Sequence, residues 1–99
     1  MKYEFKDGKL KVSLENELDM NKCKTLKGVI DGYIMRYEPE ILELHLSKVQ
    51  FMDSSGIGLI VGRYNLIKLL NASMVVSNPS SSIKRIIEMS NLSKDIVLR

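Results

Sequence analysis

The sequence predicts a single α/β domain, in which a mixed sheet of four to five strands carries its helices mainly on one face. Three observations support this prediction. Two short alternating segments flank the pair Asp7-Gly8, and helical and strand-like patterns of apolar residues then take turns along the rest of the chain. A chain of 99 residues is long enough for one hydrophobic core and too short for two. We therefore treat residues 1–99 as one domain.

The first two predicted strands form a hairpin around Asp7-Gly8. Apolar and polar residues alternate over residues 3–5 before this pair and over residues 10–14 after it. A tight type I′ turn favours Asp-Gly because both central residues need a positive φ. The hairpin therefore supplies two antiparallel strands at the start of the chain.

A long helix and a strand follow the hairpin. Asp19 suits the N-cap of a helix over about residues 20–37, in which apolar residues recur at spacings of three and four. Over Leu42–Leu46 the leucines alternate with Glu43 and His45, which predicts a strand with one buried face and one face in water. The apolar stripe of the helix consists of Cys23, Leu26, Val29, Ile30, Tyr33, Ile34 and Tyr37.

Two further helices and two short strands complete the pattern. Asp53 caps a predicted helix over about residues 55–70, and Ser73–Ser77 form the next strand. In Asn78-Pro79, the asparagine suits the N-cap and the proline the first position of a third helix. Ile96–Leu98 are expected to add an edge strand or a docked tail. The expected buried residues are Ile57, Ile60, Val61, Tyr64, Ile67 and Leu69 or Leu70 in the second helix, and Ile83, Ile86, Ile87 and Met89 in the third.

This strand order places three turns at one edge of the sheet. Crossovers between parallel strands are right-handed, so we expect the first two helices on the same face. Each strand-to-helix turn then lies at the carboxyl ends of the strands, where α/β folds have their binding sites. We therefore expect Glu17–Asp19, Asp53–Gly56 and Asn78–Ser82 to form one patch.

The composition argues against several function classes. The formal net charge is +3, but the lysines of the first third alternate with acidic residues, so no basic stripe for nucleic acid is predicted. Cys23 is the only cysteine, which precludes an internal disulfide and fits a reduced, cytoplasmic location. The sequence contains neither a long apolar run nor a signal-peptide pattern, so we expect no membrane span and no export.

The sequence lacks the groups that a nucleotide-binding site or a hydrolase site in this patch would require. The three glycines within residues 56–62 do not have GxGxxG spacing, and no GxxxxGK(S/T) phosphate loop occurs. A hydrolase that used a serine at 54–55 would need a base, but His45 is the only histidine and is expected on the far face. The GxSxG elbow is also absent. Because Glu17 and Asp19 suit cap and surface roles better than a metal site, we predict neither catalytic residues nor metal ligands.

The motif Asp53-Ser54-Ser55-Gly56 has two interpretations that its residues leave open. In the first it is an N-cap and nothing more. In the second one serine is phosphorylated. A phosphoserine carries about −1.5 to −2 charges and accepts hydrogen bonds from free amides at a helix start, so the domain stays folded. Beside Asp53 this charge would lie within the patch and oppose the docking of a partner.

Five segments of the chain carry a resemblance to one protein family: Met52–Gly58, Gly62–Tyr64, Glu17–Asp19, Ile83–Arg85 and Met89-Ser90. Together they are similar to the anti-sigma factor antagonists of the STAS domain family, most closely to those of the sigma-F pathway of sporulation. The resemblance covers nearly the whole chain. Where the family usually has glycine before Glu-Leu-Asp, this chain has Asn16, which tolerates a positive φ.

The resemblance implies a STAS-like binding module and not an enzyme. In this family the unmodified protein binds an anti-sigma factor that is also an ATP-dependent serine kinase, and the sigma factor is released. The kinase then phosphorylates the second serine of the motif, here Ser55, and a PP2C-type phosphatase removes the phosphate. ATP is bound by the partner, so this chain needs no cofactor. A general-stress antagonist with a different kinase is the alternative within the family. By the same match the docking surface comprises Glu17, Asp19, Asp53, Ser54 and Gly56.

Overall fold

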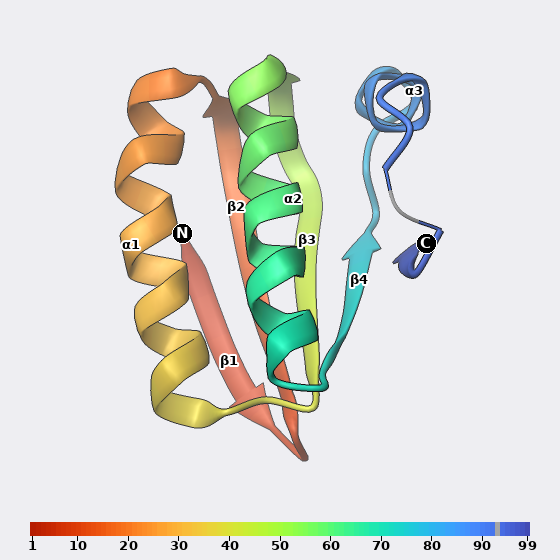
Figure 1. Ribbon diagram of the computed structural model, residues 1–99. Coiled ribbons are helices and arrows are strands. Elements are labelled where there is room, and N and C mark those ends of the chain that lie inside the picture. The colour runs from red at the N-terminus through yellow and green to blue at the C-terminus, as the bar shows by residue number, and fades with distance from the viewer. Residues whose placement is uncertain (93) are drawn as a thin grey trace.

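The computed structural model describes residues 1–92 and 94–99, and over these residues it shows one α/β domain with five strands and three helices (Figure 1). The sheet order is β1-β2-β3-β4-β5, with β1 antiparallel to β2 and the other neighbours parallel. The predicted fold class is confirmed, and the last segment is an edge strand. In chain order the elements are β1 (Lys2–Lys6), β2 (Lys9–Leu18), α1 (Met20–Tyr37), β3 (Ile41–Met52), α2 (Ser54–Leu69), β4 (Ser73–Ser77), α3 (Ser81–Met89) and β5 (Ile96–Leu98).

The hairpin of β1 and β2 forms as predicted. Asp7 and Gly8 have φ values of 52° and 79°, as a turn with two left-handed residues requires. The carbonyl of Gly8 accepts a hydrogen bond from the amide of Glu40 at 2.8 Å, which fastens the turn to the segment entering β3. Strand β1 is exposed along its whole length. The ring of Tyr3 stacks on Tyr33 with centroids 4.0 Å apart, so aromatic packing on α1 holds the strand in place.

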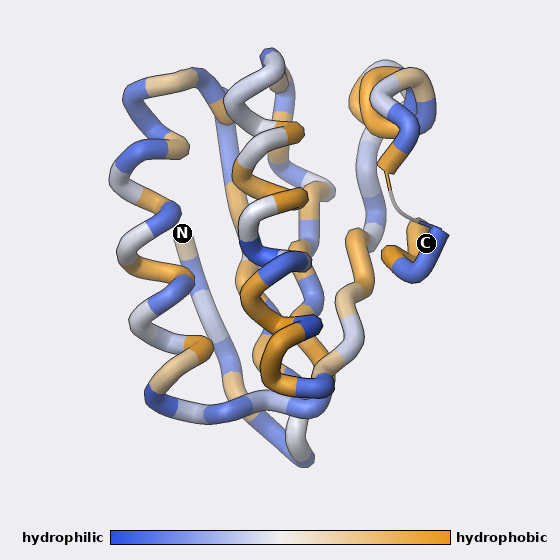
Figure 2. The backbone as a smooth tube through the Cα atoms, in the orientation of Figure 1, coloured by the Kyte–Doolittle hydropathy of each residue, from blue (hydrophilic) through white to orange (hydrophobic). Residues whose placement is uncertain are grey.

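One face of the sheet carries the hydrophobic core. In Figure 1, α1 and α2 lie side by side in front of the sheet and α3 stands apart, beyond β4. Figure 2 shows hydrophobic residues spread along much of α2, whereas α1 is more mixed. All three helices contribute to one buried cluster with β2–β5. Its largest fully buried side chains are Leu10, Leu14, Leu18, Ile30, Ile34, Leu42, Leu44, Leu46, Ile60, Ile67, Met74 and Ile83.

Strand β3 runs further than its alternation predicts. The alternating part covers Leu42–Leu46, but the strand continues to Met52. Its pairing with β2 shifts register twice, and at each shift β3 holds one extra residue. Every third side chain is therefore buried over this stretch, at Leu46, Val49 and Met52. Asn16 lies at the second shift with a φ of 64°, which confirms the positive φ that its glycine-like place in the sequence predicted.

Some details of the helix predictions are wrong. The N-cap of α3 is Ser80, whose Oγ accepts the amide of Ile83 at 3.3 Å. Asn78 instead has a φ of 55° and belongs to the turn before the helix. Met89 and Leu69 are 76% and 82% exposed, because both lie at the last residue of their helix. No helix within the described residues is long and apolar enough to cross a membrane. Three other side chains expected in the core are exposed at its margin, namely Val29, Val61 and Leu70.

The sheet face opposite the helices is less exposed to solvent than predicted. Glu43 is only 8% exposed and pairs with Lys9, whose Nζ lies 2.8 Å from its Oε1. The hydroxyl of Ser77 donates to Oε2 of Glu43, and the Oγ of Ser77 is 3.1 Å from Nδ1 of His45. Glu43 and His45 do face away from the helices, as predicted. Their exposure was overestimated because the neighbouring strands surround them with polar partners.

We expect Glu43→Gln to lower the free energy of unfolding by about 1–2 kcal/mol at pH 7, because a charged hydrogen-bond acceptor becomes neutral. Burial alone would raise the pKa of Glu43, but hydrogen bonds from Lys9 and Ser77 and the charges of Lys9 and Lys11 hold it below its ordinary value of 4.5. The stabilisation is therefore complete above pH 4.5 and is lost as the pH falls through the lower folded pKa. Thermal unfolding between pH 7 and about pH 3 measures this effect. The gap in Tm between wild type and variant should close at acid pH, and a constant gap would argue against the assignment.

Candidate functional site

Two aspartates begin the two long helices at one edge of the sheet. Asp19 is the N-cap of α1, and its Oδ1 accepts the amide of Lys22 at 2.9 Å. Asp53 is the N-cap of α2, and its Oδ1 accepts the amide of Ser55 at 2.8 Å. Both aspartates have the extended backbone that N-caps adopt. Both predicted caps are confirmed.

The two caps are neighbours because β2 and β3 end together. Leu18 pairs with Met52 in the parallel register, and each aspartate is the next residue. The thiol of Cys23 lies within reach of both carboxylates. Burial, followed by the charges of Asp53 and Asp19, raises its pKa. A thiol with a raised pKa is a poor nucleophile at neutral pH, which fits the core role expected for Cys23.

The two serines of the motif have different surroundings. Ser54 is exposed, whereas Ser55 is half-buried and borders a groove of about 330 Å³ between α1 and α2. The other walls of this groove include Met20, Lys24 and Lys27. Ser55 therefore borders a concave surface that carries two lysines, and Ser54 lies outside it.

Gly56 marks the closest approach of α2 to the sheet. It is buried, and a Cβ at this position would overlap the Cγ of Met52 and lie 3.3 Å from the Cβ of Leu18. A Cβ at Gly58 or Gly62 would meet no atom of the described residues within 4 Å. Only the first of the three glycines is therefore required by packing. The other two border the groove and leave it open.

A buried ion pair joins the two helices beside this groove. Nε of Arg63 on α2 lies 2.7 Å from Oδ1 of Asp31 on α1, and the Arg63 side chain is 5% exposed. The Asp31 side chain is 30% exposed, so the pair is buried on the Arg63 side only. Arg63 also borders the groove. The pair thus links α1 and α2 about two helical turns beyond Ser55.

The Glu17–Asp19 turn continues the surface toward β3. Glu17 is exposed and borders a shallow hollow together with Asp19 and Gln50. Glu17 pairs with Phe51 across the strands, and the ring of Phe51 is 49% exposed. The two turns therefore lie on one continuous surface, as predicted, and it holds an exposed aromatic side chain.

Four residues of this surface were missed by the sequence analysis. Phe51 lies beyond the predicted end of its strand, so no pattern marked it as exposed. Met20 is 68% exposed directly after the cap, and it was counted only as the first residue of a helix. Lys24 and Lys27 are spaced by about one helical turn. This spacing indicates a shared groove only when α2 is known to lie beside α1.

The third predicted segment, residues 78–82, does not join this surface. Strand β4 ends at Ser77, opposite His45, whereas β3 runs on to Met52. In Figure 1, α3 stands apart from α1 and α2. Within residues 1–92 and 94–99, no hydrogen bond or ion pair links residues 78–82 to the motif at the start of α2. The prediction assumed strands of similar length, and the extension of β3 makes it wrong.

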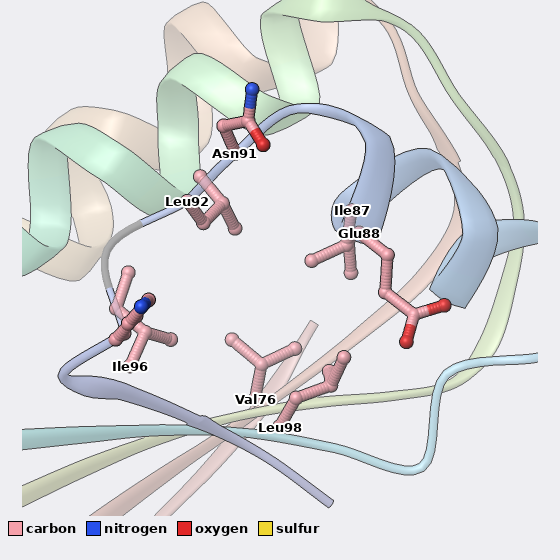
Figure 3. A pocket seen from close by; sticks show the side chains of 8 residues that line it. Val76, Ile87, Glu88, Asn91, Leu92, Ile96 and Leu98 are labelled. Carbon is pink, nitrogen blue, oxygen red and sulfur yellow. The ribbon is translucent and has the colours of Figure 1, made fainter.

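The groups that catalysis would require are not assembled around Ser55. His45 lies on the opposite sheet face, where its Nδ1 is 3.1 Å from Ser77 Oγ. In the part of the chain that the structure describes, no group of three or more His, Cys, Asp and Glu side chains could hold a metal ion. An apolar cavity of about 250 Å³ lies between α3 and β5. Val76, Ile87 and Leu98 are among the side chains that line it (Figure 3), away from the motif.

Comparisons with known sequences agree with these features. The STAS domain family matches residues 1–99. An anti-sigma F factor antagonist of Paenibacillus polymyxa is 39% identical over 87 residues, which cover 88% of this chain and 74% of that protein. An anti-sigma-B factor antagonist of Listeria monocytogenes is 25% identical over 88 residues, which cover 89% of this chain and 76% of that protein.

Solved structures show the same fold. The anti-sigma factor antagonist SpoIIAA in its unphosphorylated form matches with a TM-score of 0.78 at 20% identity, over 99% of this chain and 86% of that one. The phosphorylated form of SpoIIAA, a cell fate determinant of Bacillus, matches with a TM-score of 0.76 at 22% identity, over 99% of this chain and 89% of that one. The five-stranded sheet with its helices is therefore a fold that this chain shares with SpoIIAA.

Proposed function

This chain belongs to the anti-sigma factor antagonists of the STAS domain family, and we propose that it releases sigma-F in a partner-switching circuit. Its unphosphorylated form binds an anti-sigma factor that is also a serine kinase, in the cytoplasm. The sigma factor leaves that complex, and phosphorylation of Ser55 by the kinase ends the binding. A PP2C-type phosphatase restores the active form. ATP is bound by the kinase.

The surface around the α2 N-terminus is the observation that carries this proposal. Asp19, Asp53 and the exposed Ser54 lie together at the edge where β2 and β3 end. The exposed side chains of Met20 and Phe51 add apolar area to this polar edge. Protein interfaces combine such apolar contacts with a polar rim. We therefore assign the docking of the anti-sigma factor to this surface, with Glu17 and Gly56 as its further members.

A phosphate on Ser55 would change this surface without unfolding it. The hydroxyl lies in the first turn of α2, where the helix dipole favours negative charge. Lys24 and Lys27 line the same groove and would offset part of the added charge. The phosphate would nevertheless occupy the groove and add charge beside Asp53, so the penalty falls mainly on partner binding. SpoIIAA has a phosphorylated form with the same fold, which is consistent with this step.

The choice of sigma-F rests on sequence similarity. The sigma-F antagonist of Paenibacillus polymyxa is 39% identical to this chain, and the sigma-B antagonist of Listeria monocytogenes is 25% identical. A general-stress antagonist acting on a sigma-B complex is the second candidate, because the sigma-B relatives cover as much of the chain.

A release assay tests both candidates. Unphosphorylated protein is added to a preformed complex of the anti-sigma F factor and sigma-F, and free sigma-F is measured by size-exclusion chromatography. We expect stoichiometric release from this complex and little from the matching sigma-B complex. The reverse preference would select the general-stress function. Release from neither complex, with a protein that is folded by circular dichroism, would refute the proposal.

A further inference from the structure

A small basic hollow lies on the sheet face opposite the helices, and none of its lining residues belongs to the surface assigned to the anti-sigma factor. Its volume is about 150 Å³, and strands β1, β2 and β3 all contribute to it. Three lysines line it, namely Lys2, Lys11 and Lys48. Hydroxyl groups of the same strands and the imidazole of His45 complete its polar lining. The side chains that line this small space therefore carry five hydrogen-bond-donating groups, three amines and two hydroxyls.

The first register shift of β3 builds one wall of this hollow. His45 pairs with Ser13, but Lys48 pairs with Glu15, so β3 holds one extra residue between these pairs. Ser47 and Lys48 are consequently both exposed, and the next buried side chain comes only after them. Without the extra residue, Lys48 would take the inward position and point into the core. The bulge thus directs a hydroxyl and an amine to the side that His45 occupies.

The imidazole is held in a defined orientation at this wall. The Ser77 hydroxyl donates to Glu43, so its oxygen has to accept from the ring of His45, and Nδ1 carries the proton. The other nitrogen, Nε2, has no hydrogen-bond partner among residues 1–92 and 94–99. In this tautomer Nε2 is a hydrogen-bond acceptor, so in the hollow that His45 lines it can accept from the hydroxyl of a hydrogen phosphate but cannot donate to a phosphate oxygen.

The charges around the hollow are only partly balanced by the protein, because the charge of Lys11 acts on Glu43 while Lys2 and Lys48 have no such partner among the described residues. Among the residues that the structure describes, Glu15 is the only carboxylate that lines it, and it already lies 3.5 Å from the amino group of Met1. Glu43 is paired with Lys9. Within the described residues, the amines of Lys2, Lys11 and Lys48 form no ion pair. The site therefore has an excess of positive charge that an anion would offset.

We propose that this hollow binds a phosphate group, either as inorganic phosphate or as a small phosphate ester. A tetrahedral dianion has enough acceptor oxygens for amines that arrive from three strands, whereas a carboxylate has two. At about 30 Å³ per water molecule, the space holds about five waters, which suits a phosphate group. It is smaller than the roughly 300 Å³ at which pockets for larger ligands begin. The site is separate from Ser55 and does not depend on the proposed sigma-F function.

A titration followed by two-dimensional NMR tests this site. Inorganic phosphate is added to uniformly ¹⁵N-labelled protein at pH 7, with ionic strength held constant by sodium chloride. We expect saturable shifts of the amides of Ser13, His45, Ser47 and Lys48. In Lys48→Gln the affinity should fall about tenfold, as for the loss of one charged hydrogen bond. The control Lys84→Gln removes the same charge from the exposed side of α3 and should bind like wild type.

The outcomes separate the possible sources of the phosphate group. Tighter binding of O-phosphoserine than of inorganic phosphate would identify an ester as the natural ligand, and the opposite order would identify the free anion. Shifts that are not saturable, or that are equal in wild type and Lys48→Gln, would overturn the proposal. Shifts confined to the first turn of α2 would also overturn it, because they would place the anion at the opposite face.

Discussion

With its anti-sigma kinase and ATP, the chain is expected to gain one phosphate on Ser55, and Ser55→Ala is expected to gain none. Ser55 borders the groove between the helices, while Ser54 is exposed outside it, so a kinase docked at this edge meets two different hydroxyls. Intact-mass spectrometry and peptide mapping measure the modification. Ser54→Ala is the matched control and should be phosphorylated like wild type. Phosphate on Ser54 or on the serines at 80–82 would reject the assignment.

Binding by the same variants distinguishes an electrostatic block from a loss of contact. Ser55→Ala keeps the shape of the surface and should bind the kinase within about twofold of wild type. Ser55→Asp adds one charge beside Asp53 and should weaken binding about tenfold or more, as for about 1.4 kcal/mol. Its Tm should stay close to that of wild type, because a carboxylate in the first turn of a helix is tolerated. Equal binding by both variants, measured by calorimetry, would exclude the charge mechanism.

The sequence predicted the elements well where one physical signal decided the structure. Asp7-Gly8 determined the hairpin, because few other pairs accept two positive φ values. The two aspartate caps and the leucine alternation of β3 were also correct, because each depends on neighbouring residues only. The N-cap of α3 was predicted less well, since Asn78, Pro79 and Ser80 all suit a helix start. Only the folded chain shows that Ser80 takes this role.

The candidate site was predicted only as far as the strand ends could be placed. The caps at Asp19 and Asp53 were correctly expected to be neighbours, because both follow strands that pair. Over the bulged part of β3, which ends at Met52, every third side chain is buried. A search for alternating apolar residues does not detect this spacing. Because the extension of β3 was not predicted, Phe51 was not recognised as exposed, and residues 78–82 were wrongly assigned to the patch. Lys24 and Lys27 were missed for a different reason. They share a groove with Ser55 only because α1 packs beside α2.

Replacing Gly56 by alanine is expected to lower the free energy of unfolding by up to about 2 kcal/mol, because overpacking a core usually costs about 1–3 kcal/mol and the gain in helix propensity offsets part of this cost. The added Cβ would overlap the Cγ of Met52 and crowd Leu18. Met52 is 2% exposed, so its side chain has little room to move away. Helix propensity acts in the opposite direction, because alanine favours a helix by about 1 kcal/mol over glycine. The measured loss in the free energy of unfolding is therefore the packing penalty minus the gain in helix propensity.

Gly58→Ala and Gly62→Ala are the matched controls for this prediction. A Cβ at either position meets nothing within 4 Å in residues 1–92 and 94–99, so only the propensity gain remains, and both variants should be more stable by up to about 1 kcal/mol. Urea unfolding of the three variants measures the difference. If all three were equally stable, the contact of Gly56 with the strand ends would not limit the approach of α2. A loss at Gly56 alone would show that this contact sets the position of the α2 N-terminus. Because Ser55 directly precedes Gly56, the same contact would then fix the serine against the Asp19 turn.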